Sequence, residues 1–116
     1  MRTIKFRGKS LNTGMWVYGD LQHKGKRAFI EYEVDPVTVG QYTGFQDKNT
    51  REVYEGDVLT DKFESIGVIE WQNGCFVVNF GDVDVFQISD CFDDLYQMWV
   101  IGNIHDNPEL LKGGEQ

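Results

Sequence analysis

The sequence has few of the residues from which disulfide frameworks and metal sites are built. Its two cysteines, Cys75 and Cys91, lack the CxxC spacing of zinc and redox motifs and are too few for a disulfide framework. Its two histidines, His23 and His105, fall short of the three or four nitrogen or sulfur ligands that zinc requires. We therefore expect a reduced protein that needs no metal and no cofactor.

Long apolar runs are also missing. No run approaches the roughly 20 apolar residues of a membrane-spanning helix, and residues 1–5 lead into alternating sequence without a signal-peptide core. We therefore expect a cytoplasmic protein that does not contact membranes. The chain of 116 residues is long enough for one domain with its own core. We place this β-rich domain at residues 1–111, followed by a flexible tail at residues 112–116.

The sequence contains none of the local patterns that commonly mark enzymes. There is no GxSxG elbow, and there is no GxxxxGK[ST] or GxGxxG loop to hold phosphates. Cys91 follows Asp90 and has no cationic neighbour that would favour a thiolate. We therefore expect no catalytic residues and no enzymatic activity.

Basic residues are the minority, and most of them lie in one part of the chain. The net charge is −8, but residues 1–27 hold seven of the eleven basic residues and one of the nineteen acidic residues, a net charge of +6. Residues 28–116 have a net charge of −14. Ion pairs within the fold, contacts between subunits, or a basic surface for nucleic acid would each explain this asymmetry. The candidate binding patch consists of Lys5, Arg7, Lys9, Lys24, Lys26 and Arg27.

Alternation with period two dominates the remaining sequence, which predicts a mainly β fold. In residues 27–34, we expect Ala28, Ile30, Tyr32 and Val34 to face inward. Trp16 and Tyr18 also alternate with their neighbours, and we assign both to the core.

Two turn signals predict a three-stranded meander. Asn73-Gly74 and Gly81-Asp82 are favourable two-residue hairpin turns. Two tight hairpins would place four apolar pairs on one face, namely Trp71 with Phe76, Ile69 with Val78, Val78 with Val85, and Phe80 with Val83. After this meander we expect a short helix at residues 90–97, a final strand at residues 99–104, and a capped turn at residues 107–111.

Separate segments of the chain, in the same order, resemble one protein family. Residues 38–44 read TVGQYTG, residues 53–58 read VYEGDV, and residues 100–104 read VIGNI. These segments resemble the YopX protein family, whose members carry a GQ-(F/Y)-TG element, a DKNG-like turn and an IYEGD element. The signature residues are Gly40, Gln41, Gly44, Asp47, Tyr54, Glu55, Gly56, Asp57, Gly102 and Asn103.

The resemblance implies a small SH3-like β-barrel or roll with antiparallel hairpins and one or two short helices. It also implies a bacteriophage or prophage protein in a bacterial host cell, and it implies no activity. One departure is Thr50, which follows Asn49 where relatives usually have a glycine. Asn49 can itself adopt the positive φ that a tight turn requires.

The Glu55-Gly56-Asp57 stretch places two carboxylates around a glycine. We interpret it as a turn at an exposed corner, in which Gly56 lets the backbone bend and Asp57 or Glu55 accepts hydrogen bonds from unpaired amides. The alternative is that these carboxylates receive Arg or Lys from a partner.

Three functions remain open on the sequence alone. The first is a non-enzymatic binding or assembly protein that acts through protein contacts, as a homo-oligomer or with another protein. The second is an accessory protein that binds nucleic acid through its basic N-terminal region. The third is an acidic decoy of a host nucleic-acid-binding protein.

Overall fold

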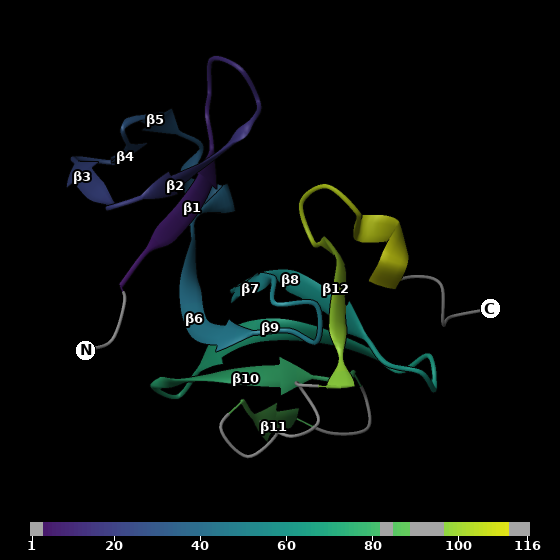
Figure 1. The fold of residues 1–116 in the computed structure, drawn as a ribbon. Coiled ribbons are helices and arrows are strands. Elements are labelled where there is room, and N and C mark those ends of the chain that lie inside the picture. Colours follow the sequence, from purple (N-terminus) through teal and green to yellow (C-terminus); the bar gives the residue numbers. More distant parts are fainter. Residues whose placement is uncertain (1–3, 82–84, 89–96, 112–116) are drawn as a thin grey trace.

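A computed structural model describes residues 4–81, 85–88 and 97–111 (Figure 1). In these residues the chain forms antiparallel sheets and two 3-10 helices, η1 (Pro36–Thr38) and η2 (Pro108–Leu111). The prediction of a mainly β, antiparallel fold is confirmed. No closed barrel is found among the described residues, so the SH3-like barrel stays a prediction. No described helix is long and apolar enough to cross a membrane.

The first sheet contains the N-terminal strand and much of the family signature. Its order is β2-β1-β6-β7. The strands are β1 (Phe6–Lys9), β2 (Trp16–Gly19), β6 (Gly40–Gln46) and β7 (Glu52–Tyr54). β6 links the two ends of the molecule, because it runs from β1 towards the second sheet (Figure 1).

The second sheet covers the larger core and has the order β11-β10-β9-β8-β12. The strands are β8 (Asp57–Thr60), β9 (Ile66–Gln72), β10 (Cys75–Asn79), β11 (Val85–Gln87) and β12 (Trp99–Asn103). Alternate residues from these strands pack together, as period-two alternation requires. The buried cluster is Val53, Leu59, Ile69, Phe76, Val78, Ile88, Met98 and Val100.

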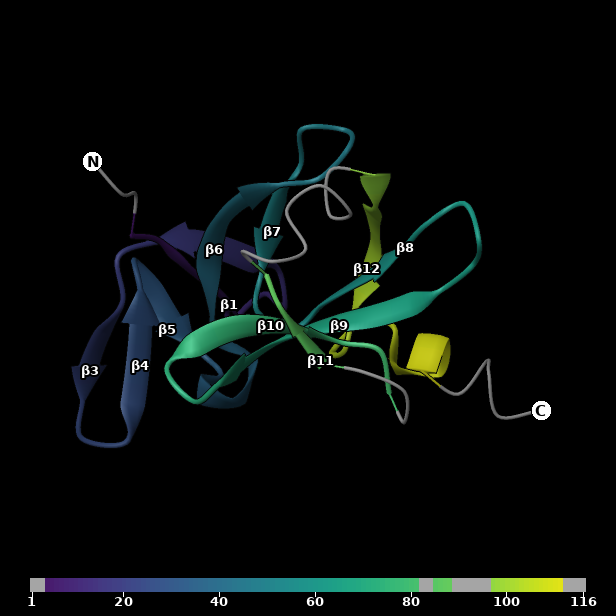
Figure 2. The ribbon, with the colours of Figure 1, turned by 90° about the horizontal axis from the view of Figure 1, so that it is seen from below.

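The third sheet is a small antiparallel unit of β3 (Gln22–Lys24), β4 (Arg27–Ile30) and β5 (Tyr32–Val34). It lies at the end of the molecule away from the second sheet (Figures 1 and 2). Ala28, Ile30 and Val34 are buried in a second core cluster, as predicted. Tyr32 is 62% exposed, so its predicted inward position is wrong. Glu31 has a φ of 63°, and the chain reverses there instead of continuing as one strand.

The first predicted hairpin is confirmed. Asn73 and Gly74 have φ values of 51° and 83°, as a type I′ turn requires. Phe76 lies opposite Trp71, and Val78 lies opposite Ile69. Phe76 and Val78 are buried, whereas Trp71 is half exposed and contacts the Phe76 ring edge to face.

The second predicted hairpin has the wrong register. Val78 lies opposite Phe86, not Val85, and Val85 lies opposite Asn79. The Asn79 side chain accepts a hydrogen bond from the Gly81 amide at 2.8 Å, so the reversal begins before the expected two-residue turn. A one-residue shift moves every side chain of a strand to the other face, and Phe86 therefore contacts Phe80. The predicted partner of Phe80, Val83, lies outside the described residues.

The C-terminal elements follow the prediction where they are described. The predicted helix at residues 90–97 lies outside the described residues except for Gln97, which is helical. β12 confirms the final strand. Pro108 opens η2, and the Leu110 amide donates to the Asn107 carbonyl at 3.1 Å, which confirms the turn with proline at its first position. The Asn107 side chain accepts from the Asn103 amide and not from an amide of η2.

Candidate functional site

The turn between β7 and β8 is built as the sequence predicts. Gly56 has a φ of 92°, a conformation that favours glycine. The Tyr54 amide donates to Asp57 Oδ2 at 2.7 Å. The Gly56 amide donates to the Ile69 carbonyl at 2.8 Å. These contacts confirm that the segment is a turn with Asp57 as the hydrogen-bond acceptor.

The expected exposure of this corner is wrong, because Asp57 is buried against Arg7. Asp57 is 2% exposed and Arg7 is 5% exposed, and Arg7 Nη2 lies 2.8 Å from Asp57 Oδ1. Burial raises the pKa of the Asp57 carboxyl, while the Arg7 charge acts in the opposite direction. Asp57 therefore receives an arginine of its own chain, and the alternative that these carboxylates receive Arg or Lys from a partner stays a prediction.

Arg7 is also enclosed by aromatic rings. Its guanidinium carbon lies 4.6 Å from the ring centroid of Trp16 and 5.0 Å from that of Tyr54, within cation–π range. Arg7 Nε is buried and has no hydrogen-bond partner. Trp16 is thus half buried on a charged group, and Tyr18 is half exposed beside Tyr54. The assignment of Trp16 and Tyr18 to the core is therefore wrong.

Asp106 joins this cluster from the loop after β12. It accepts a hydrogen bond from Trp16 Nε1 at 2.7 Å and forms an ion pair with Lys9. Lys9 and then Trp16 are the main causes that lower the pKa of Asp106 to about 2. Burial, followed by the charge of Arg7, lowers the pKa of His105. We call these contacting residues the junction cluster, because they connect the first sheet to β8 and to the loop after β12. Its members are Arg7, Lys9, Trp16, Tyr54, Asp57 and Asp106.

Asp47 has a comparable structural role in the loop between β6 and β7. Its Oδ1 accepts hydrogen bonds from the Asn49 and Arg51 amides, and its Oδ2 accepts one from the Val100 amide at 2.9 Å. One buried carboxylate therefore closes the loop and fixes it to β12. The positive φ of this loop belongs to Thr50, at 64°, and not to Asn49, which corrects the expectation for this departure from the family pattern.

At two other signature residues, Gly40 and Gly102, a neighbouring segment lies too close for a side chain. A Cβ on Gly40 would lie 2.6 Å from the Glu55 carbonyl oxygen, and a Cβ on Gly102 would lie 2.5 Å from Asn107 Oδ1. The Glu55 amide donates to the Gln41 carbonyl. Gly44 has a φ of 89°, a conformation that favours glycine, and Asn103 accepts hydrogen bonds from the His105 and Asp106 amides. These signature residues therefore take part in turns and close contacts of the fold.

The basic patch predicted from the sequence is divided by ion pairs. Four of its six residues pair with carboxylates of the same chain, namely Lys5 with Glu52, Arg7 with Asp57, Lys9 with Asp106, and Arg27 with Glu33. Lys24 and Lys26 form no ion pair with the residues that the structure describes. Much of the excess positive charge of residues 1–27 is thus paired with carboxylates of residues 28–116 within the fold.

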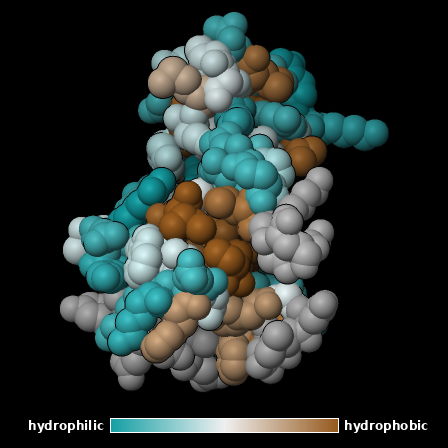
Figure 3. Space-filling model, turned by 90° about the vertical axis from the view of Figure 1, so that its right-hand side faces the viewer, coloured by the Kyte–Doolittle hydropathy of each residue, from teal (hydrophilic) through white to brown (hydrophobic). Residues whose placement is uncertain are grey.

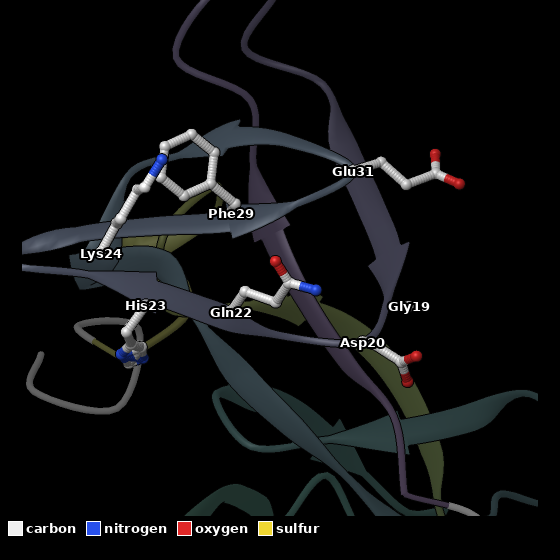
Figure 4. Close-up of a pocket in the computed structure, with 7 residues that line it drawn as sticks. All are labelled: Gly19, Asp20, Gln22, His23, Lys24, Phe29 and Glu31. Carbon is white, nitrogen blue, oxygen red and sulfur yellow. The ribbon is translucent and has the colours of Figure 1, made fainter.

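Lys24 lines an open groove on the third sheet, which the sequence did not reveal. The groove has a volume of about 770 Å³. Asp20 and Glu31 lie towards one end, and Lys24 and His23 lie towards the other (Figure 4). The lining residues are Gly19, Asp20, Gln22, His23, Lys24, Phe29 and Glu31. Its five polar side chains make no hydrogen bond or ion pair with any described residue.

Two other kinds of site, a metal centre and a hydrophobic patch, have less support in the structure. The described residues contain no group of three or more His, Cys, Asp or Glu residues that could hold a metal ion. Hydrophobic residues gather at the centre of the face of the molecule that Figure 3 shows. Nothing in the described part of the chain indicates what would bind there, so the groove is the stronger candidate.

Together these observations define, in the described residues, a mainly β scaffold with a polar junction that is paired within the fold and an open groove on the third sheet. The family model for the YopX protein matches residues 5–112, and the chain belongs to this family. It is also similar to the crystal structure of protein EF1440 from Enterococcus faecalis, with a TM-score of 0.63 and 27% sequence identity. That match covers 96% of this chain and 99% of the other. No curated protein matches the chain significantly.

Proposed function

We propose that this YopX-family protein is a small non-enzymatic binding or assembly protein that acts through protein–protein contacts. The groove on the third sheet is its contact surface. The observation that carries this proposal is the division of polar groups: the buried signature carboxylates Asp47 and Asp57 accept hydrogen bonds within the fold, whereas the polar side chains of the groove have no partner among the described residues. We further propose that it acts in the cytoplasm of a bacterium that carries the phage or prophage.

The groove suits a protein better than a nucleic acid. Asp20 and Glu31 would repel a phosphate backbone, and the chain as a whole has a net charge of −8. Most of the basic patch is already paired with carboxylates. A half-buried Phe29 between acidic and basic groups is instead suited to a polypeptide with both charges.

Affinity capture with a matched pair of variants tests this function. Lys24→Glu reverses a charge in the groove, whereas Lys62→Glu reverses an exposed charge in the turn between β8 and β9. We expect wild-type and Lys62→Glu proteins to retain the same protein partner, either a second copy or a host protein identified by mass spectrometry. Lys24→Glu should lose it.

Two results would overturn the proposal. One is capture of the same proteins by Lys24→Glu and wild type. The other is binding of labelled oligonucleotides at low salt that Lys24→Glu removes, because that result would assign the groove to nucleic acid.

A further inference from the structure

β3 has one free edge. It is the terminal strand of the order β3-β4-β5, and no described strand pairs with its other side. All three residues of β3 are exposed, and two perpendicular views place it at the outer boundary of the molecule (Figures 1 and 2). Such an edge presents unpaired backbone N–H and C=O groups, which can pair with another strand.

The turn after β3 determines which backbone groups face outward. Gly25 has a φ of 63°, which suits the first central position of a two-residue type II′ turn. The residues flanking such a turn, Lys24 and Arg27, lie opposite each other and bond directly. Hydrogen bonding alternates along an antiparallel pair, so the N–H and C=O of His23 point to the free edge.

The sequence around His23 is complementary to itself when it is read antiparallel. Residues 20–26 read DLQHKGK. If two copies pair about a twofold axis at His23, Gln22 lies opposite Lys24 of the second copy. The same register brings Asp20 close to Lys26 of the second copy. Opposite charges at paired positions stabilise antiparallel strands, and an isologous dimer requires this kind of self-complementary surface.

The charges in the groove are arranged in the same direction as those of residues 20–26. Its acidic end contains Asp20 and Glu31, and its basic end contains Lys24 (Figure 4). A twofold axis through His23 places the acidic end of each copy against the basic end of the other. With Lys26 included, the acidic and basic groups at this contact balance. Asp20 of each copy therefore lies near Lys26 of the other copy, which carries the opposite charge.

We propose that two copies of this protein associate through β3, and that their third sheets form one continuous six-stranded antiparallel sheet with the twofold axis at His23. This inference rests on the proposed function, because it identifies the protein that contacts the groove as a second copy. A three-residue strand buries a small area, so the dimer dissociates on dilution, as small interfaces do.

Site-specific cross-linking tests the register. Gln22→Cys and Lys24→Cys are each introduced into a Cys75→Ser/Cys91→Ser background and mixed under mild oxidation. Gln22 and Lys24 of different copies are directly opposite and non-hydrogen-bonded in the proposed pairing, so their Cβ atoms lie within about 5.5 Å. We expect at least a fivefold higher yield of disulfide dimer from the mixture than from either variant alone, falling on dilution.

The controls separate a specific contact from random collision. Lys62→Cys, mixed with Gln22→Cys, reports the collision rate of exposed thiols, and circular dichroism of each variant checks the fold. A mixture that gives no more dimer than this control overturns the inference. So does equal cross-linking by Gln22→Cys alone, which would indicate another register.

A charge exchange tests the same pairing without cysteine. Asp20→Lys and Lys26→Asp each place like charges opposite each other, and each should raise the dimer Kd about tenfold in sedimentation equilibrium. The double variant restores opposite charges and should recover affinity, whereas failure to recover contradicts the register. If capture instead finds a host protein that requires Lys24 and the cross-link is missing, the inference fails while the proposed function stands.

Discussion

The junction cluster around Arg7 and the groove on β3 and β4 are two polar regions of this protein that differ in how their charged groups are paired. At the junction, Arg7, Asp57 and Asp106 are paired with groups from other sheets. In the groove, Asp20, Lys24 and Glu31 have no partner among the described residues. Charged residues at the junction are therefore paired by folding, while the groove contains none of the signature residues.

Replacing Arg7 in the junction cluster should cause the largest loss of stability. Arg7→Met leaves the buried Asp57 carboxylate without its partner, and we expect the free energy of unfolding in urea to fall by about 3 to 5 kcal/mol. Adding Asp57→Asn removes the unpaired charge and should recover part of the loss. A loss below about 1 kcal/mol would mean that the junction does not hold the sheets together.

Thr50→Gly should raise the stability of the protein, whereas Arg7→Met should lower it. Thr50 has a φ of 64°, which is unfavourable for a β-branched residue. We expect glycine to stabilise the protein by about 1 kcal/mol, measured as a higher urea midpoint. Thr50→Ala keeps a Cβ at the same φ and should give a smaller gain. An unchanged midpoint for Thr50→Gly would show that this loop stores no strain.

Acid should weaken the junction through Asp106. Its folded-state pKa of about 2 lies below the ordinary value of 3.8, so its contribution to stability is complete above the ordinary pKa and is lost as the pH falls towards 2. The stability difference between wild type and Asp106→Asn should therefore shrink between pH 5 and pH 2. Because Asp106 is partly exposed, solvent screening keeps this effect small. Urea titrations across this range measure it, and a constant difference would contradict the assignment.

Lys24→Glu should have the smallest effect on stability. Its side chain contacts no described carboxylate, so we expect the free energy of unfolding to change by less than about 0.5 kcal/mol, as for Lys62→Glu. Self-association should weaken only for Lys24→Glu. A large loss of stability would make Lys24 part of the scaffold and remove the contrast with Arg7.

Local signals in the sequence predicted local structure well. Asn73-Gly74 requires positive φ at two adjacent positions, and the hairpin register follows from that requirement. Glu31 carries no such signal, so the reversal that exposes Tyr32 was not predictable from alternation. The register that places Phe86 opposite Val78 occurs with a hydrogen bond from the Gly81 amide to the Asn79 side chain, which the turn signal at residues 81–82 does not indicate.

The candidate sites were less predictable, because they depend on contacts between distant residues. Arg7 and Asp57 belong to different sheets, and nothing near either residue indicates that both are buried. The groove combines residues from β3, β4 and the segments that flank them. Its parts carry no motif, although the self-complementary charges of residues 20–26 are visible in the sequence once β3 is known to be an edge strand.

Amide hydrogen exchange at low and high protein concentration compares the two regions in a single measurement. Protection at His23 should rise with concentration, because its outward N–H becomes hydrogen-bonded in the dimer. Protection at Gly56, whose amide bonds to the Ile69 carbonyl, should be high and independent of concentration. Exchange at His23 that is unchanged by concentration, or a concentration dependence at Gly56, would contradict the division between a junction paired within the fold and an open contact surface.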